Sequence, residues 1–148
     1  MNDLLKILEA VANLWGQETV QAILKKIDTQ NIKWNGSLRR SIIYSQKGTN
    51  IEFDMADYGQ FIDEGVNGTL IKRGSPYSFK GKVGGTAKAI KPWATSKGLN
   101  EWAVAKSIQK KGIKKRPFFK SVIEFRAPSL EKAITKATED YINSKLKP

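Results

Sequence analysis

Residues 41–55 read SIIYSQKGTNIEFDM, and this pattern predicts a β-hairpin. Apolar and polar side chains alternate on both sides of a four-residue turn, Lys47 to Asn50, as expected of strands with one buried face. The predicted first strand begins at Leu38, and the second ends at Ala56. The buried face would carry the apolar side chains of Leu38, Ile42, Tyr44, Ile51, Phe53 and Met55. The sequence therefore predicts a small antiparallel sheet.

Helical patterns lie on both sides of this hairpin. Apolar residues recur every three or four positions through residues 2–27, which predicts a long N-terminal helix. After the hairpin, a short helical turn is expected from a cap at Asp57 to a glycine at position 65. The later predicted helices cover residues 100–111, 118–125 and 128–142. Helices packed on a small sheet predict an α+β fold, in a single domain spanning residues 1–148.

Residues 66–98 differ in composition from the rest of the chain. They hold six Gly, two Pro, seven Lys or Arg, and no acidic residue. A segment of this length and composition predicts a long basic Gly-rich insertion loop or arm within the domain. Its scattered aromatic residues argue against permanent disorder. We therefore expect a loop with partial hairpin character that becomes ordered when it docks onto a partner.

Nearly all of the excess positive charge lies in residues 65–123. This segment holds fourteen Lys or Arg against one acid, Glu101, whereas the remaining residues hold twelve basic and thirteen acidic side chains. A cationic segment of this kind indicates an acidic partner. The candidate contacts to a neighbouring subunit or to DNA are Lys72, Arg73, Lys80, Lys82, Lys88, Lys91, Lys110, Lys111, Lys114 and Lys115.

Composition argues against most enzyme classes. The chain has no Cys and no His, so it lacks disulfides, thiolate metal sites and the commonest general base. The carboxylates nearest to a nuclease-like pattern are those of Glu52, Asp54, Asp63 and Glu64, and we expect them to serve on the surface. The Gly-rich stretch at 81–86 lacks the ending of a phosphate-binding loop. We expect no catalytic residue, metal or cofactor.

Three stretches in a fixed order resemble those of a known family. They read NGSLRRSI at residues 35–42, YGQFIDEG at 58–65 and KGIKKRPFF at 111–119, and a C-terminal amphipathic helix follows. Together they resemble the HK97-type family of small tailed-phage proteins that lie at the head-tail junction or complete the tail. The motif residues are Tyr58, Phe61, Glu64, Gly65, Arg116, Pro117 and Phe118. Gly65 would let the chain turn sharply, and Arg116-Pro117 would direct Phe118 into the core.

The resemblance implies a structural virion protein without enzymatic activity, made in the bacterial host cytoplasm. Six or twelve copies would form a ring around the DNA channel, at the neck or at the tail end. The implied partners are portal, connector or tail-tube proteins with acidic surfaces, with transient contact to packaged DNA. No apolar stretch approaches the roughly 18 residues that a membrane span needs, so no membrane partner is expected. The alternative function is a nucleic-acid-binding protein that uses residues 65–123.

Overall fold

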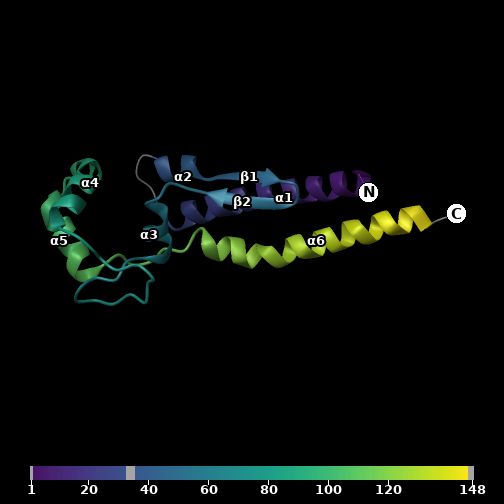
Figure 1. The fold of residues 1–148 in the computed structure, drawn as a ribbon. Coiled ribbons are helices and arrows are strands. Elements are labelled where there is room, and N and C mark those ends of the chain that lie inside the picture. Colours follow the sequence, from purple (N-terminus) through teal and green to yellow (C-terminus); the bar gives the residue numbers. More distant parts are fainter. Residues whose placement is uncertain (1, 33–35, 147–148) are drawn as a thin grey trace. The chain divides into compact units, whose positions relative to one another are not determined.

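The computed structural model describes residues 2–32 and 36–146, and it has the predicted α+β fold (Figure 1). The described residues form six helices and one two-stranded antiparallel sheet. The chain divides into two compact units, where the sequence predicted a single domain. Unit 1 consists of residues 1–56 and 118–148, and unit 2 consists of residues 57–117.

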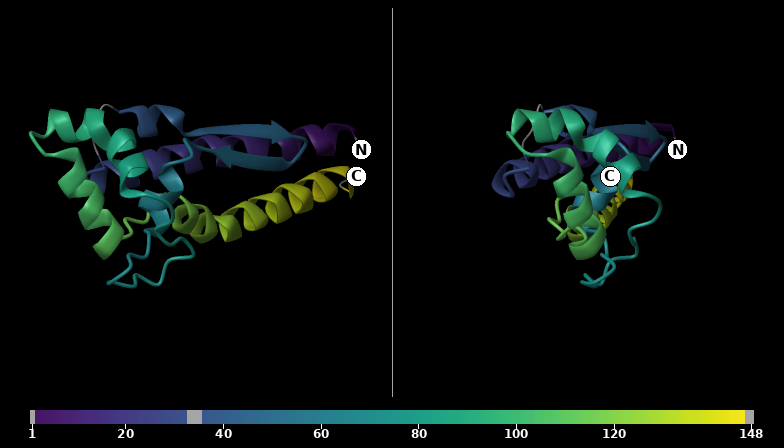
Figure 2. Two further views of the ribbon diagram at one scale, coloured as in Figure 1. Left: turned by 60° about the vertical axis from the view of Figure 1, so that its left-hand side comes forward. Right: turned by 90° about the vertical axis from the view of Figure 1, so that its left-hand side faces the viewer.

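Two long antiparallel helices run along unit 1, α1 (Asn2–Thr29) and α6 (Lys120–Leu146) (Figure 2). The predicted N-terminal helix is thus confirmed. The buried Trp15 joins the two helices, because its indole Nε1 donates to the carbonyl of Arg126 and to the hydroxyl of Ser129, both at 3.1 Å. Close by, Arg126 Nε donates to the fully buried Thr19 hydroxyl at 2.9 Å. No helix of the described residues combines the length and apolarity that crossing a membrane requires.

The hairpin also packs on α1. Its strands are β1 (Ile43–Lys47) and β2 (Asn50–Asp54), and Tyr44 pairs with Phe53 in the register. The Phe53 ring meets Trp15 edge-on, with 5.7 Å between ring centroids, and the Tyr44 hydroxyl bonds to Asn13. The predicted alternation therefore holds for the centre of the hairpin, with one face on α1.

The first strand is shorter than predicted. Residues 37–41 form a helical turn, α2 (Ser37–Ser41), so β1 begins at Ile43 rather than at Leu38. Gly36 has a φ of 77°, and its carbonyl accepts from the Arg40 amide at 3.0 Å, which starts the turn. Leu38 is buried as expected, but it lies in a helical turn rather than in a strand. Asn35, which opens the first family-like motif, lies outside the described residues.

One helix replaces the two that the sequence predicted at the C-terminal end. Pro128 was expected to begin a new helix, yet it lies inside α6. Proline inside a helix removes the hydrogen bond to the carbonyl four residues earlier, here that of Glu124, so contacts with the rest of the fold must offset this cost. The Arg126 carbonyl accepts from the Ser129 hydroxyl at 2.6 Å and from the Trp15 indole. Packing against α1 therefore keeps the helix continuous.

Unit 2 contains three helices, α3 (Gly59–Glu64), α4 (Val83–Ser96) and α5 (Glu101–Lys111). The predicted ends of α5 are confirmed. The Asn100 side chain accepts from the amides of Trp102 and Ala103, both at 3.0 Å, and Gly112 follows the last residue. For α3, the end at Gly65 is also confirmed, but the residue before the helix is Tyr58 rather than Asp57.

The prediction of a loop throughout residues 66–98 is wrong for residues 83–96, which form α4. This helix packs on α5, and its Ala87 and Ala94, seven residues apart, are both buried. Gly84 faces the Trp102 ring, and a Cβ there would lie 3.4 Å from it. Residues 66–82 contain no helix or named strand, but isolated bridges pair Val66 with Ile113 and residue 67 with residue 78.

Candidate interaction surface

The segment that follows Gly65 closes the C-terminal end of α5. The amide of Thr69 donates to the carbonyl of Gln109 at 2.8 Å, and the amides of Leu70 and Ile71 donate to Lys110 at 2.9 and 3.1 Å. The last carbonyls of a helix lack partners within it, so an outside segment that satisfies them binds firmly. This part of the predicted arm is therefore held by main-chain hydrogen bonds.

One of the candidate basic residues, Arg73, contributes to the same closure, and a second, Lys72, bonds within the segment that closes the helix end. Arg73 Nε donates to the Lys111 carbonyl at 2.9 Å, and Lys72 Nζ donates to the Gly68 carbonyl at 3.3 Å. Positive charge near a helix C-terminus is favourable, because the helix dipole is negative there. Both side chains thus have a structural role in addition to their charge.

A single side chain, Asn67, organises the following turn. Its Oδ1 accepts from the amides of Arg73 at 2.7 Å and Ser75 at 3.1 Å. Its Nδ2 donates to the carbonyl of Ser75 at 2.8 Å and to the hydroxyl of Ser78 at 3.3 Å. The sequence predicted only a long loop over residues 66–98, so this role of Asn67 was missed.

Replacing Asn67 with alanine should loosen residues 66–82 while the helices of unit 2 remain. Four hydrogen bonds are lost, and each contributes about 1 kcal/mol when neutral and partly exposed. We expect the Arg73 and Ser75 amides to exchange with deuterium at least about tenfold faster. Asn143→Ala, at an exposed site of α6 in unit 1, is the matched control. Unchanged exchange in Asn67→Ala would contradict this role.

Closing the helix end requires glycine at positions where the backbone segments approach. Val66 and Ile113 exchange two hydrogen bonds of 2.9 and 2.8 Å, which bring the segments together. Gly65 (φ 76°, ψ −174°) and Gly112 (φ 68°, ψ −161°) both adopt a backbone conformation that is essentially restricted to glycine. The sharp turn predicted at Gly65 is thus confirmed.

An exposed apolar pair lies beside this closed helix end. The side chain of Leu70 is 75% exposed and that of Ile71 is 40% exposed, although their amides are fixed on the Lys110 carbonyl. Basic residues of both segments flank the pair. We call this group the Leu70 patch; it comprises Leu70, Ile71, Lys72, Arg73, Lys110 and Lys111. A rigid apolar centre with a cationic rim has the make-up of a protein-binding surface.

The remaining candidate basic residues are more widely distributed along the chain. Lys80 and Lys82 precede α4, Lys88 and Lys91 lie on it, and residues 114–115 follow the bridge at Ile113. Within residues 2–32 and 36–146, none of the ten candidates forms an ion pair with a carboxylate. Unit 2 holds thirteen Lys or Arg against four acids, a formal charge of +9. The structure therefore brings four of the ten candidates together in the Leu70 patch, with Lys114 and Lys115 further along the chain.

The motif residues have mainly structural roles. Tyr58 precedes α3, Glu64 is its last residue, and the Arg116 amide donates to the Ile62 carbonyl at 2.8 Å. Phe61 meets Tyr77 edge-on at 5.1 Å, and the Tyr77 hydroxyl bonds to Gln60 at 3.2 Å. Phe118, which follows Pro117, is fully buried, as the sequence predicted.

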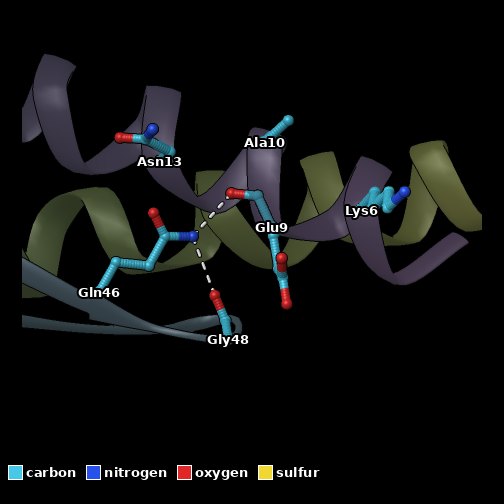
Figure 3. Close-up of a pocket in the computed structure, with 6 residues that line it drawn as sticks. All are labelled: Lys6, Glu9, Ala10, Asn13, Gln46 and Gly48. Atoms are coloured by element: carbon cyan, nitrogen blue, oxygen red, sulfur yellow. Dashed lines mark hydrogen bonds between the residues drawn. The ribbon is translucent and has the colours of Figure 1, made fainter. Parts of the chain in front are cut away.

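A small-molecule or metal site is less well supported. An open groove of about 390 Å³ separates α1 from the hairpin, lined by Lys6, Glu9, Ala10, Asn13, Gln46 and Gly48 (Figure 3). The Gln46 amide already donates to the carbonyls of Glu9 at 2.7 Å and Gly48 at 2.9 Å, so few convergent groups remain. Among the described residues, no three His, Cys, Asp or Glu side chains gather in a way that could hold a metal ion.

Comparisons with known proteins found no relative of this chain. No protein-family model matches the chain, and neither a curated protein sequence nor a solved structure is significantly similar to it.

Proposed function

We propose that the protein is a structural virion protein of a tailed phage. It forms a ring at the head-tail junction or at the tail end, and it joins or completes the tail around the DNA channel. The observation that carries an assembly role is the Leu70 patch, in which an exposed apolar pair with a cationic rim is fixed by main-chain bonds. The three family-like motifs support the phage context.

The proposed partners are acidic surfaces of neighbouring subunits and of portal, connector or tail-tube proteins. A channel lined by many copies of unit 2, each with a charge of +9, would hold many DNA phosphates at once. Such binding would hinder DNA that must pass through the channel. Most of the basic side chains therefore face protein, and few face the DNA.

The proposal is tested by sizing and negative-stain imaging of the purified 16.6 kDa chain, alone and with portal complexes. We expect rings, or a ring added to the portal. A Leu70→Asp variant should assemble poorly, because a carboxylate would replace the apolar centre of the patch. Lys132→Glu, at an exposed site of α6 outside the patch and outside the candidate contacts, is the control. A chain that neither forms nor joins rings would contradict the proposal.

The charge of unit 2 also supports the alternative of nucleic-acid binding, which makes a different prediction. If the basic side chains serve assembly, duplex DNA should bind with a dissociation constant on the order of 10⁻⁵ M or weaker near ~0.15 M salt. The edge-on contact of Tyr77 with Phe61 leaves that ring less available for stacking on bases. Tight binding with a steep salt dependence, measured by fluorescence anisotropy over a salt series, would favour the alternative.

A further inference from the structure

The outer face of the hairpin carries negative charge around an exposed apolar residue. Side chains of alternate residues share a face of a sheet, so the face opposite α1 presents Ile43 and Ser45 from β1 and Glu52 and Asp54 from β2. We call these four residues the hairpin face. Ile43 is 56% exposed, and the other three are also exposed.

The two carboxylates of the hairpin face have no cation opposite them. In the register, Glu52 pairs with Ser45 and Asp54 pairs with Ile43. Lys47, the one cation within strands β1 and β2, pairs with Asn50 at the turn. Neither carboxylate forms an ion pair within the described part of the chain. Two like charges on one strand face repel each other, so an external cationic surface would stabilise them.

We propose that the Leu70 patch of one copy docks onto the hairpin face of a second copy. The two surfaces are complementary in kind, since each has one well-exposed aliphatic anchor, Leu70 or Ile43, beside charges of opposite sign. Pairing the apolar centres and the charged rims follows the usual anatomy of a protein interface. The inference rests on the proposed ring, and it names the contact that would build it.

This contact is head to tail. Each copy carries both a Leu70 patch and a hairpin face. When the patch of one copy binds the face of the next, the face of the first copy and the patch of the second remain available to bind further copies. Contacts of this type close into rings when the rotation between copies permits it. Each patch is small, so a closed ring, in which every copy is held on two sides, gains stability that a single pair lacks.

Charge reversal provides the first test. In the full chain, Glu52→Lys/Asp54→Lys makes both surfaces positive. Lys72→Glu/Lys110→Glu/Lys111→Glu keeps Arg73, which bonds to the Lys111 carbonyl, and leaves more acidic than basic side chains in the patch, so both surfaces become negative. Each variant alone should lose self-association by about tenfold or more, because like charges then face each other. An equimolar mixture should restore it in a 1:1 ratio. The readouts are analytical ultracentrifugation and native mass spectrometry.

Matched variants separate this effect from changes in folding or net charge. Glu131→Lys/Glu139→Lys makes the same change on exposed sites of α6, and Lys25→Glu/Lys26→Glu/Lys132→Glu reverses three exposed cations of α1 and α6 that are not candidate contacts. Both should associate as the unmodified chain does. Circular dichroism should show the same helicity in all variants. The hydrogen bonds that close the end of α5 accept at the main-chain carbonyls of Lys110 and Lys111, which a side-chain substitution leaves in place.

Engineered cysteines provide a second, direct test, because the chain has none of its own. Copies carrying Ile43→Cys, mixed with differently tagged copies carrying Leu70→Cys, should form a disulfide-linked pair on mild oxidation. Lys132→Cys, at an exposed site of α6, replaces Ile43→Cys in the control and should give little linked product. Equal yields from both mixtures would overturn the proposed contact.

The outcomes distinguish this inference from the function on which it rests. Rings that form equally well with either charge-reversed variant would overturn the contact and leave the ring function standing. A chain that joins portal complexes through the Leu70 patch, but does not need the hairpin face, would assign the patch to another protein and also overturn the inference. A chain that neither forms nor joins rings would overturn the proposed function itself.

Discussion

Replacing Gly112 with alanine should destabilise unit 2 by roughly 3–5 kcal/mol, which combines backbone strain with overpacking. A Cβ at this position would lie 2.0 Å from the Val66 carbonyl oxygen and 2.6 Å from the Gly68 amide nitrogen. Both obstacles are backbone atoms, so neither can move without breaking the closure of α5. Urea unfolding and deuterium exchange at the Val66 and Ile113 amides would measure the loss.

Gly98 offers a matched control for this substitution. It has the same φ of 68°, but a Cβ at that site would meet no neighbouring group within 4 Å. Gly98→Ala therefore carries the backbone cost alone, about 1–2 kcal/mol. If Gly112→Ala were no worse than Gly98→Ala, the close approach of the two segments would not limit stability, and the account of the Leu70 patch as a rigid surface would fail.

Replacing Trp15 with alanine should have the largest effect on unit 1. The side chain is buried, bonds to α6 through its indole, and contacts the hairpin through Phe53. Truncating a buried Trp to Ala costs about 3–5 kcal/mol, because apolar contact is lost and a cavity remains. We expect a lower midpoint of urea unfolding by circular dichroism.

Two further variants show how much of the lost stability comes from the indole hydrogen bonds and from the burial of Trp15. Trp15→Phe keeps an aromatic ring but removes the indole donor, so it should cost about 1–2 kcal/mol, less than the alanine variant. The neighbouring Leu14 is 56% exposed, and Leu14→Ala should change stability by well under 1 kcal/mol. A Trp15→Ala variant as stable as Leu14→Ala would show that the α1–α6 contact does not depend on this residue.

The helices and strands that were predicted correctly from the sequence are those whose signals are local. Asn100 and Gly112 bracket α5, and the alternation around the Gly48 turn identifies the hairpin centre. Such signals depend on residues within a few positions of each other, so they can be read without knowing the fold. The α+β class follows from them. They also identified Gly65 as the end of α3.

The errors occurred where contacts between distant residues override local propensity. Glycines at 84 and 85 and Pro92 disfavour a helix, yet α4 forms, packs on α5 and buries Ala87 and Ala94. Pro128 was expected to start a helix, but packing on α1 keeps α6 continuous. The spacing of Ala87, Ile90 and Ala94 was a helical signal that the glycine content obscured.

The sequence predicted the positive charge of the candidate surface but not its structure. Composition located the basic residues, but it could not show that Arg73 closes a helix end or that Leu70 is exposed among them. Those facts depend on the pairing of residues 66–71 with residues 109–113, about forty positions away. The role of Asn67 likewise depends on tertiary hydrogen bonds.

The division of the chain into two units has a consequence for the order of folding. Unit 2 is a continuous stretch of 57–117, whereas Trp15 and Arg126 in unit 1 are separated by 111 positions. Contacts between distant residues form later than local ones, and during synthesis they must wait for the distant residue to emerge. Unit 2 and its Leu70 patch can therefore be in place on the ribosome before α6 exists to pair with α1.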